Sequence, residues 1–394
     1  MFRSPSFPDK AIHGRDHFVR SSRGNYVIET WSDIEPIRSR WKVIESSGVS
    51  TPFQSYAWVS ALLQSVGRSF DAEPHIVIAK DRKTGEDLML IPLVRRRAQL
   101  LQFLEFPDFK VSDYNSPIIS RSIASDTAKV AEVWDAVIQS LPASDILYLQ
   151  KIPQILSDVP NPLISLKGFR PECYSSWQLP LDENLNDLER KTLPFSARRE
   201  IRRRTRRLQE LGALRYVIPA SQAERKALFD VLRQQRQSRF ASLGRRNILT
   251  SPAHSRFYDL ILQSEFDQEV VTVHGLKVGD QIIATAFGLY WQKRFHLLMI
   301  TLASGEWPRL APGLVMIWNL IAHMHAKGCR TFDFTIGDEP YKRRLGAKNC
   351  TLSEYFRARS PVGAPYALGL WLWPFLVATK RKFAKTGEGH STTR

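Results

Sequence analysis

The stretch RTFDFTIGDEPYKRRLGAK, residues 330–348, joins the pattern of a short strand to that of a turn and a short helix. Successive side chains of a strand point to opposite faces, so Phe332 and Phe334 share one face and Asp333 lies on the other. A carboxylate flanked by aromatic residues needs a polar partner or a ligand, because burial of an unpaired charge is costly. Asp333 is therefore the first candidate functional residue.

The turn after this strand has two interpretations. Gly337 permits a turn, Asp338 is placed to cap a helix, and Pro340 suits the first turn of that helix. Capping is the commoner role for Asp338 considered alone. The turn also brings several ionisable groups to the carboxyl end of one strand, which is typical of acid–base catalysis. These groups are Asp333, Asp338, Glu339, Tyr341 and Lys342.

The preceding segment APGLVMIWNLIAHMHAKG, residues 311–328, predicts a helix that is apolar nearly all round and hence buried. Its start at Pro312 and Gly313 carries few bulky side chains, so the unpaired N–H groups of the first turn stay accessible. With Arg309 just upstream and the positive end of the helix dipole, such a start can hold a phosphate. The alternative is that Pro312 and Gly313 only begin a core helix, and the sequence leaves both open.

Strand and helix patterns alternate along the whole chain. Each half shows helices, an antiparallel hairpin and then a helix beside a strand, which indicates a duplicated, mixed α/β architecture. We expect an N-terminal unit over residues 24–180 and a C-terminal unit over 181–360. A basic arm, 1–23, precedes them, and an apolar and basic tail, 361–394, follows.

Composition places the 394-residue chain among ordinary globular proteins. Apolar residues make up 43% and charged residues 24%, which excludes a fully disordered, collagen-like or disulfide-scaffold protein. The formal net charge of +17 is concentrated in 1–23, 190–207 and 361–394, unlike a uniformly basic nucleic-acid binder. The apolar run 364–378 is shorter than the roughly 20 residues of a membrane-spanning helix. We expect it to lie on an anionic membrane surface or to dock against the second unit.

Several well-known site patterns are missing. The chain has no Walker A loop, no GxGxxG after a strand, no GxSxG and no HExxH. The cysteines Cys173, Cys329 and Cys350 are scattered, and no histidine lies near them at ligand spacing, so we expect no metal. The first twenty residues contain no continuous apolar stretch. We therefore expect no secretory signal and a cytoplasmic location.

A helix rich in arginine is predicted near residues 190–212. On a helical wheel centred on Ile201, one narrow stripe contains Ala197, Leu208 and Leu211. The opposite half carries Arg198, Arg199, Arg202, Arg203, Arg206 and Arg207. A solvated face screened by salt is one interpretation. Acidic lipid or polysaccharide, the phosphates of a coenzyme, and RNA are the others. RNA is the least favoured, because no aromatic side chains interleave with the arginines for base stacking.

The quoted segments resemble a known family. The string FDFTIGDEPYKRRLGA, with APGLVMIWNLIAHMHAKGC, VHGLKVGDQIIATAFGLYW, PFQSYAWVSAL and DYNSPII, resembles the CelD/BcsL group of GNAT-fold acyltransferases, which is linked to bacterial cellulose biosynthesis. The resemblance covers about residues 24–360. It implies an α/β fold of two tandem GNAT-like (acyl-CoA N-acyltransferase) domains with mixed, mostly antiparallel sheets, in a layout similar to the FemAB aminoacyltransferases.

The resemblance also implies an activity, with acetyl-CoA as co-substrate and a sugar, polysaccharide precursor or cell-envelope molecule as acceptor. The residues expected at the coenzyme are Arg309, Ala311, Pro312, Gly313, Leu314 and Lys342. The expected catalytic residues are Asp333, Asp338, Glu339 and Tyr341, with a carboxylate as base and Tyr341 returning a proton to the leaving thiol. The Q/R-x-x-G-x-G/A loop of GNAT enzymes is absent, and PRLAPG, residues 308–313, is a shortened form of it.

Two other functions stay open at this point. A FemAB-like aminoacyl-tRNA-dependent ligase is favoured by the basic helix. A non-catalytic subunit that binds cellulose or exopolysaccharide synthesis proteins is the second alternative. The expected location is cytoplasmic, with peripheral attachment to the inner face of the cytoplasmic membrane through the tail 361–394.

Overall fold

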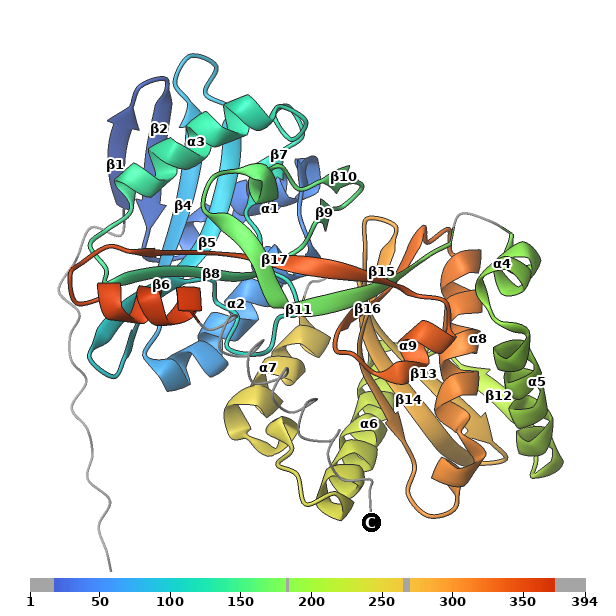
Figure 1. Ribbon diagram of the computed structural model, residues 1–394. Helices are drawn as coiled ribbons and strands as arrows, with labels where there is room; N and C mark the ends of the chain where they lie inside the picture. Colours follow the sequence, from blue (N-terminus) through green and yellow to red (C-terminus); the bar gives the residue numbers. More distant parts are fainter. Residues whose placement is uncertain (1–17, 182–183, 265–269, 373–394) are drawn as a thin grey trace, which may run out of the picture.

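A computed structural model describes residues 18–181, 184–264 and 270–372 (Figure 1). Most of the predicted basic arm and most of the predicted tail lie outside the described residues. The strands of the first half are β1 (Phe18–Arg23), β2 (Tyr26–Trp31), β3 (Gly48–Val49), β4 (Glu73–Asp81), β5 (Asp87–Ala98), β6 (Leu101–Glu105), β7 (Ile118–Ser120), β8 (Ile146–Ile152), β9 (Ile155–Leu156), β10 (Val159–Pro160) and β11 (Phe169–Pro180). Its helices are α1 (Arg38–Ser47), α2 (Tyr56–Gln64) and α3 (Thr127–Ser140).

The second half carries longer helices beside its strands (Figure 1). The helices are α4 (Leu185–Thr192), α5 (Phe195–Glu210), α6 (Gln222–Ser242), α7 (Pro252–Gln263), α8 (Pro312–Ala326) and α9 (Pro340–Arg344). The strands are β12 (Leu214–Val217), β13 (Val271–Val278), β14 (Gln281–Trp291), β15 (Arg294–Leu302), β16 (Thr331–Ile336) and β17 (Lys348–Ala358).

One continuous sheet runs through both halves. Its strand order is β1-β2-β4-β5-β6-β8-β17-β11-β16-β15-β14-β13-β12, with β3 and β7 paired beside this path. Within the described residues the pairs are antiparallel except for β6 with β8 and β15 with β16. The predicted fold class, α/β with a mixed and mostly antiparallel sheet, is confirmed. The similar place of the two parallel pairs agrees with a duplicated architecture.

The two halves are interlocked at the centre of this sheet. β17, from the end of the described chain, pairs with β8 of the first half on one side and with β11 on the other. β11 in turn pairs with β16 of the second half. The predicted boundary at residues 180 and 181 thus falls where β11 leaves the sheet, after the strand has already joined the second half.

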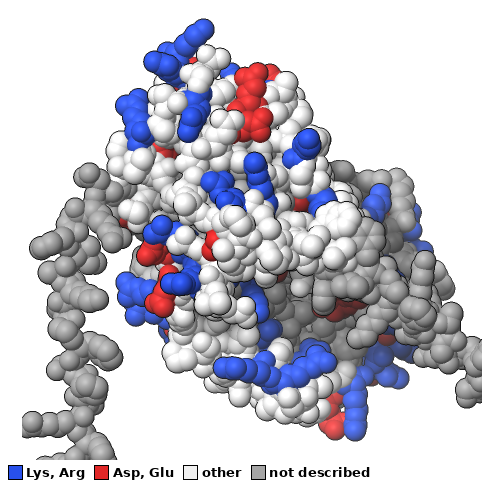
Figure 2. Space-filling model, turned by 60° about the vertical axis from the view of Figure 1, so that its left-hand side comes forward, with Lys and Arg blue, Asp and Glu red and all other residues white. Residues whose placement is uncertain are grey.

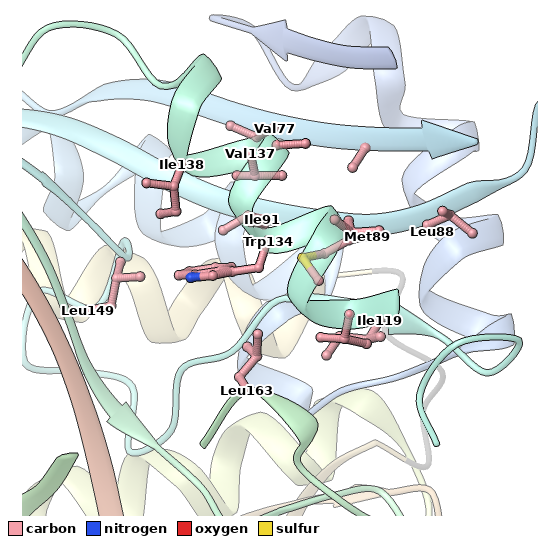
Figure 3. Close-up of a cluster of buried hydrophobic side chains, with 14 of the residues drawn as sticks. Val77, Leu88, Met89, Ile91, Ile119, Trp134, Val137, Ile138, Leu149 and Leu163 are labelled. Atoms are coloured by element: carbon pink, nitrogen blue, oxygen red, sulfur yellow. The ribbon is translucent and has the colours of Figure 1, made fainter. Parts of the chain in front are cut away.

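The core of the first half shows why α3 forms there. Val130, Val133, Trp134 and Val137 recur at helical spacing and are all buried. They face the sheet and pack with side chains such as Met89 (Figure 3). The side chain of Asp126 caps the helix by accepting a hydrogen bond from the backbone N–H of Lys129 at 3.0 Å.

A second core lies across the boundary between the halves. Trp58 of α2 meets Phe257 of α7 edge to face, with ring centroids 4.9 Å apart. Phe53 and Tyr114 of the first half belong to the same buried cluster as Phe287 of β14. Burial of this much aromatic surface fixes the position of the loops of one half against the sheet of the other.

The surface carries its positive charge in several places. On the face shown in Figure 2, lysine and arginine side chains lie in small groups among uncharged ones. Over the described residues, no helix combines the length and the apolar character that crossing a membrane requires. The described end of the chain, residues 364–372, is a short helix whose large apolar side chains are largely exposed.

Candidate active site

The parallel pair β15 and β16 opens part-way along its length. The pairing ends at His296 and Asp333, whereas β15 stays paired with β14 as far as Leu302 and β16 stays paired with β11 as far as Ile336. The two strands therefore separate beyond Asp333. We call this opening the fork. Beyond His296 the edge of β15 that faces the fork has no strand partner in the described sheet, so an extended amide chain can hydrogen-bond to its backbone N–H and C=O groups.

The start of α8 lies beside the fork. A Cβ atom added at Gly313 would be 3.2 Å from Leu302 Cδ2, at the end of β15. The residue before the helix, Ala311, has a left-handed backbone with φ of 51°, and no side chain caps the helix. The predicted uncapped helix start is therefore present, and it can accept an anion. Pro312 is buried, whereas Ala311, Gly313 and Leu314 are half-buried.

Arg309 has the charge predicted for a phosphate contact but already has a partner. Its side chain is 80% exposed and pairs with Glu306 Oε2 at 2.6 Å. Its carbonyl accepts a hydrogen bond from Arg204 Nη1 of α5 at 3.0 Å. The arginine-rich helix thus packs directly against the segment that leads into α8.

Asp333 lies at the closed end of the fork and is fully buried. It accepts hydrogen bonds from Tyr114 Oη at 2.7 Å, the Thr335 N–H at 2.8 Å and Gln178 Nε2 at 3.1 Å. Arg294 Nη1 lies 3.5 Å from its Oδ2. Burial raises the pKa of Asp333, and the charge of Arg294 opposes that rise. With its oxygens occupied, this carboxylate acts as a junction between the halves.

Thr335 sits where the strands part, in a strained conformation. Its φ of 56° is unusual for a β-branched residue. Three hydrogen bonds hold it there: its N–H to Asp333, its hydroxyl to the Leu297 carbonyl at 3.0 Å, and its own carbonyl from Lys342 Nζ at 3.3 Å. Backbone strain that the surroundings enforce in this way concentrates at functional sites. Asp333 and Lys342 therefore both act on the fork through Thr335.

Lys342 was expected at the coenzyme, but its ammonium group is buried and occupied. Besides the Thr335 carbonyl, it donates to the carbonyls of Ile336 at 3.1 Å and Gly337 at 3.0 Å. It also lies 3.0 Å from Glu339 Oε2. These contacts tie down the loop after β16.

In the turn GDEPYK, Asp338 does not cap the helix that follows, contrary to the sequence-based prediction. α9 begins at Pro340 with Glu339 as its N-cap residue, and no side chain caps it. Asp338 is exposed and instead pairs with Arg343 Nη2 at 3.0 Å. The prediction that Asp338 caps this helix is wrong, because the helix starts one residue later and an arginine on it competes for the carboxylate.

The predicted catalytic residues do not all meet at one point. Tyr341 packs against Phe334, with ring centroids 6.1 Å apart, and Phe334 faces the core under α8. Asp333 points to the opposite face of β16, toward Tyr114. Asp338, Glu339 and Lys342 share the turn beyond the strand. Burial raises the pKa of Tyr341.

A further carboxylate reaches the fork from the first half of the chain. Asp113 lies in the loop between β6 and β7, and its carboxyl group is close enough to Thr335, Lys151 and Asp333 to interact with them electrostatically. The residue is half-buried, so part of it stays accessible. Burial raises the pKa of Asp113 to about 6, while Thr335 and Lys151 lower it. A carboxylate with such a pKa is suited to proton transfer near neutral pH.

Asp113 was missed by sequence reasoning. The segment DYNSPII was quoted only for its family resemblance, and no residue in it was selected. A polar residue in a loop about 220 positions before Thr335 gives no local sign of contact with it. The only available signal was a cluster of polar residues directly after a strand pattern, which is a weak one.

The arginine-rich helix α5 is confirmed as an amphipathic element. Ala197, Ile201 and Leu208 are buried, and most of its arginines are exposed. Leu211, predicted in the same stripe, is instead 59% exposed, because α5 ends at Glu210. Arg202 pairs with Glu189 at 3.1 Å and Arg204 with Glu200 at 3.4 Å. No carboxylate among the described residues pairs with the others, which are Arg198, Arg199, Arg203, Arg206 and Arg207.

Comparison with known proteins agrees with this geometry. Residues 196–343 match the family model described as an acetyltransferase (GNAT) domain. The match covers the part of the chain that holds the fork and the start of α8, so this part is similar to a GNAT domain. No curated protein sequence matches the chain. Within the described residues, no group of three or more histidine, cysteine, aspartate or glutamate side chains is arranged to hold a metal ion.

Solved structures show the same fold at low identity. The alignment with FemX covers 82% of this chain and 96% of FemX, with a TM-score of 0.58 and 10% sequence identity. A second similar structure is the C-terminal domain (DUF2156) of a putative lysylphosphatidylglycerol synthetase from Agrobacterium fabrum. This alignment covers 85% of this chain and 96% of that domain, with a TM-score of 0.52 and 14% sequence identity. The GNAT domain makes the protein an acyltransferase, and such a domain implies an acyl-CoA as co-substrate.

Proposed function

We propose that the protein transfers an acetyl group from acetyl-CoA to a hydroxyl or amine on a sugar, a polysaccharide precursor or another cell-envelope molecule. The observation that carries the proposal is the fork, which opens beside an uncapped helix start inside the GNAT domain. The unpaired edge of β15 at the fork suits the amides of an extended pantetheine arm, and the helix start suits a diphosphate.

Residues at the helix start fit such a donor. The half-buried Ala311, Gly313 and Leu314 leave room for the diphosphate to approach the backbone, and Arg309 is the exposed cation closest to them in sequence. When bound, the coenzyme supplies an activated thioester. Lys342 supports this site indirectly, since it holds the carbonyls of the loop that follows β16.

In the proposed reaction Asp113 accepts the proton of the acceptor hydroxyl or amine. A new bond forms between the acceptor atom and the acyl carbon, the carbon–sulfur bond breaks, and the thiolate takes up a proton. Strand N–H groups at the fork stabilise the negative charge that develops on the acyl oxygen. Tyr341 is our proposed donor of the thiol proton, and Asp338 and Glu339 are the alternative bases. Asp333 is a positioning residue that acts through Thr335.

The finer identity of the protein is also a proposal. The DFTIGDEPYKR string supports a place in the CelD/BcsL group, and with it a role beside cellulose or exopolysaccharide synthesis proteins. The helix at 364–372 supports peripheral attachment to an anionic membrane surface, since Val362, Leu368 and Leu372 are exposed by 63%, 57% and 39%.

One observation favours a second candidate, transfer of an aminoacyl group from tRNA. Five arginines of α5, which are Arg198, Arg199, Arg203, Arg206 and Arg207, lack carboxylate partners among the described residues. α5 also contacts the segment that leads into α8 through Arg204. A row of guanidinium groups beside a donor site suits a phosphate backbone. Saturable binding of aminoacyl-tRNA, with no binding of acetyl-CoA, would favour this candidate over the first.

The test of the first candidate uses Gly313→Asp. A carboxylate at this position repels a diphosphate and is favourable at a helix N-terminus. The added Cβ would lie 3.2 Å from Leu302 Cδ2, so the melting temperature should fall only slightly. Calorimetry should show acetyl-CoA binding weakened by about tenfold or more. The control is Gly369→Asp, at a glycine with no atom within 4 Å of an added Cβ. Equal binding by both variants would contradict a donor site at α8.

A further inference from the structure

The first half contains a cavity at the counterpart of the fork. β6 and β8 also run parallel, and β6 ends at Glu105, opposite Tyr148, while β8 continues to Ile152. A cavity of about 390 Å³ lies beyond this point. Its lining includes Phe70, Arg96, Glu105, Phe106, Asp108, Phe109, Lys110, Asn115, Tyr148 and Gln150, with Ile248 and His254 from the second half.

This cavity lies next to Asp113. Asn115, two residues from Asp113, lines the cavity, and its Nδ2 donates to Asp108 Oδ2 at 3.2 Å. His254 of α7 also lines the cavity. Tyr258, one turn further along α7, interacts electrostatically with Asp113, which lies just outside the lining. The loop of residues 106–116 therefore runs from the cavity to the fork.

The register of the sheet explains this proximity. β8 and β16 run in opposite directions, because three antiparallel steps separate them. Through β17, the carboxyl end of β8 comes level with Pro171 of β11. The carboxyl end of β16 comes level with Ser176 of the same strand. The two parallel pairs thus open toward a common region.

The charges that line the cavity are balanced. Arg96 pairs with Glu105 at 2.6 Å, and Asp108 pairs with Lys151 at 2.8 Å. The exposed Lys110 completes the charged lining. Burial lowers the pKa of His254, so this side chain is neutral at pH 7. Two cations, Arg96 and Lys110, and two carboxylates, Glu105 and Asp108, line the cavity. Their charges cancel, so the lining does not favour binding of a ligand with a strong net charge.

The remaining lining combines an aromatic wall with planar hydrogen-bonding groups. Phe70 and Phe109 are stacked, with ring centroids 5.6 Å apart and planes 8° apart, and Phe70 is 43% exposed. Gln150 Nε2 and Tyr148 Oη are hydrogen-bonded to each other beside them. An aromatic face packs against the C–H face of a sugar ring, while amide, phenol and carboxylate groups bind its hydroxyls.

We infer that this cavity binds an uncharged sugar unit of the acceptor and presents its hydroxyl or amino group to Asp113. The inference rests on the proposed acyl transfer and deepens it by assigning the acceptor class and its binding residues. The cavity volume corresponds to about a dozen waters, which leaves room for a monosaccharide or a disaccharide. A larger saccharide would extend out of the cavity along the loop 106–116.

Calorimetry with cellobiose, an uncharged disaccharide, tests the inference on the full chain. We expect saturable binding that Phe70→Ala weakens by about tenfold or more. The matched control is Phe18→Ala, which removes a phenylalanine that is 38% exposed and packs against Trp31 with ring centroids 4.5 Å apart. This control should bind cellobiose like the unmodified protein. No cellobiose binding, or equal binding by both variants, would overturn the inference.

A charge variant provides an independent readout. Glu105→Gln leaves Arg96 without its carboxylate, so binding of glucuronic acid should increase relative to cellobiose. Preference for glucuronic acid in the unmodified protein would contradict an uncharged ligand.

Kinetics separate this inference from the proposed function. With acetyl-CoA as donor, Phe70→Ala should raise KM for the saccharide and leave KM for the donor unchanged. Cellobiose binding without any acetyl transfer would overturn the proposed reaction and leave the cavity assignment standing. Acetyl transfer whose saccharide KM does not respond to Phe70→Ala would overturn the cavity assignment and leave the reaction standing.

Discussion

At the scale of single residues, buried polar groups of both halves meet at Thr335. Asp333 and Lys342 hold its backbone from two sides, and Tyr114 of the first half holds Asp333. When a buried carboxylate or ammonium group loses one partner, the free-energy cost of removing the group from water is no longer offset by that interaction. The strained conformation of Thr335 therefore depends on contacts that only the assembled halves provide.

Asp113→Asn should abolish most activity without loss of stability. As a base, Asp113 works only when deprotonated, so kcat/KM should fall about tenfold per pH unit below about 6. The amide should lower turnover by about 10²- to 10⁴-fold. A pH–rate profile of both proteins gives the measurement.

The same substitution makes a prediction for stability. The pKa of Asp113 is raised from 3.8 to about 6 in the folded protein, so the folded state binds the proton more tightly than the unfolded state. Stability from this group is complete below the lower value and is lost as pH rises through about 6. Asp113→Asn should thus melt no lower than the unmodified protein at pH 7. Asp338→Asn is the comparison, and a rate loss in that variant alone would place the base in the GDEPYK turn.

At the scale of elements, β11 and β17 decide how the chain can be divided. β11 belongs to the first half but pairs with β16 and β17 of the second half. β17 belongs to the second half but pairs with β8 and β11 of the first half. A half that lacks its exchanged strand exposes an unpaired edge, which favours aggregation. We therefore expect the folding of the predicted units 24–180 and 181–360 to be coupled.

Separate expression of residues 1–180 and 181–394 tests this coupling. We expect neither fragment to show a cooperative thermal transition by circular dichroism, because the first lacks β17 and the second lacks β11. Co-expression should restore a soluble complex with a cooperative transition. A fragment 181–394 that melts cooperatively and binds acetyl-CoA by itself would show that the two units fold independently.

At the scale of the whole molecule, the helix at residues 364–372 presents an apolar surface and contains no charged side chain. The helix at 364–372 packs on the first half through Tyr366, whose ring lies 5.2 Å from that of Phe103, and through the Leu370 carbonyl, which accepts from Arg170 at 2.8 Å. Leu368 and Trp371 are exposed by 57% and 53%. Lys380, Arg381, Lys382 and Lys385 follow in the sequence.

Leu368→Glu and Trp371→Glu should weaken binding to vesicles that contain anionic lipid, by about tenfold for each change, since burial of the apolar side chains is lost. Sedimentation with vesicles measures this. The control is Val43→Glu, on α1, where valine is 65% exposed. Equal sedimentation of all three variants would place membrane contact elsewhere or exclude it.

The sequence by itself determined the local elements of this protein. Periodic apolar residues define α3, α5 and α8, and the alternation around Asp333 defines β16, because these patterns depend on neighbours a few residues apart. The uncapped start at Pro312 and Gly313 was predictable for the same reason. So was the arginine face of α5, whose buried stripe fixes which side is exposed.

Only the tertiary structure decided where these elements meet. The interaction of Asp113 with Thr335, the occupation of Lys342 by loop carbonyls and the exchange of β11 and β17 join residues far apart in the chain. The pairing of Asp338 with Arg343 depended on where α9 begins, and one residue changed the result. Such contacts form when the elements pack around a common core. Because burial of apolar surface is not directional, sequence patterns do not specify which helix and sheet faces from distant parts of the chain pack together.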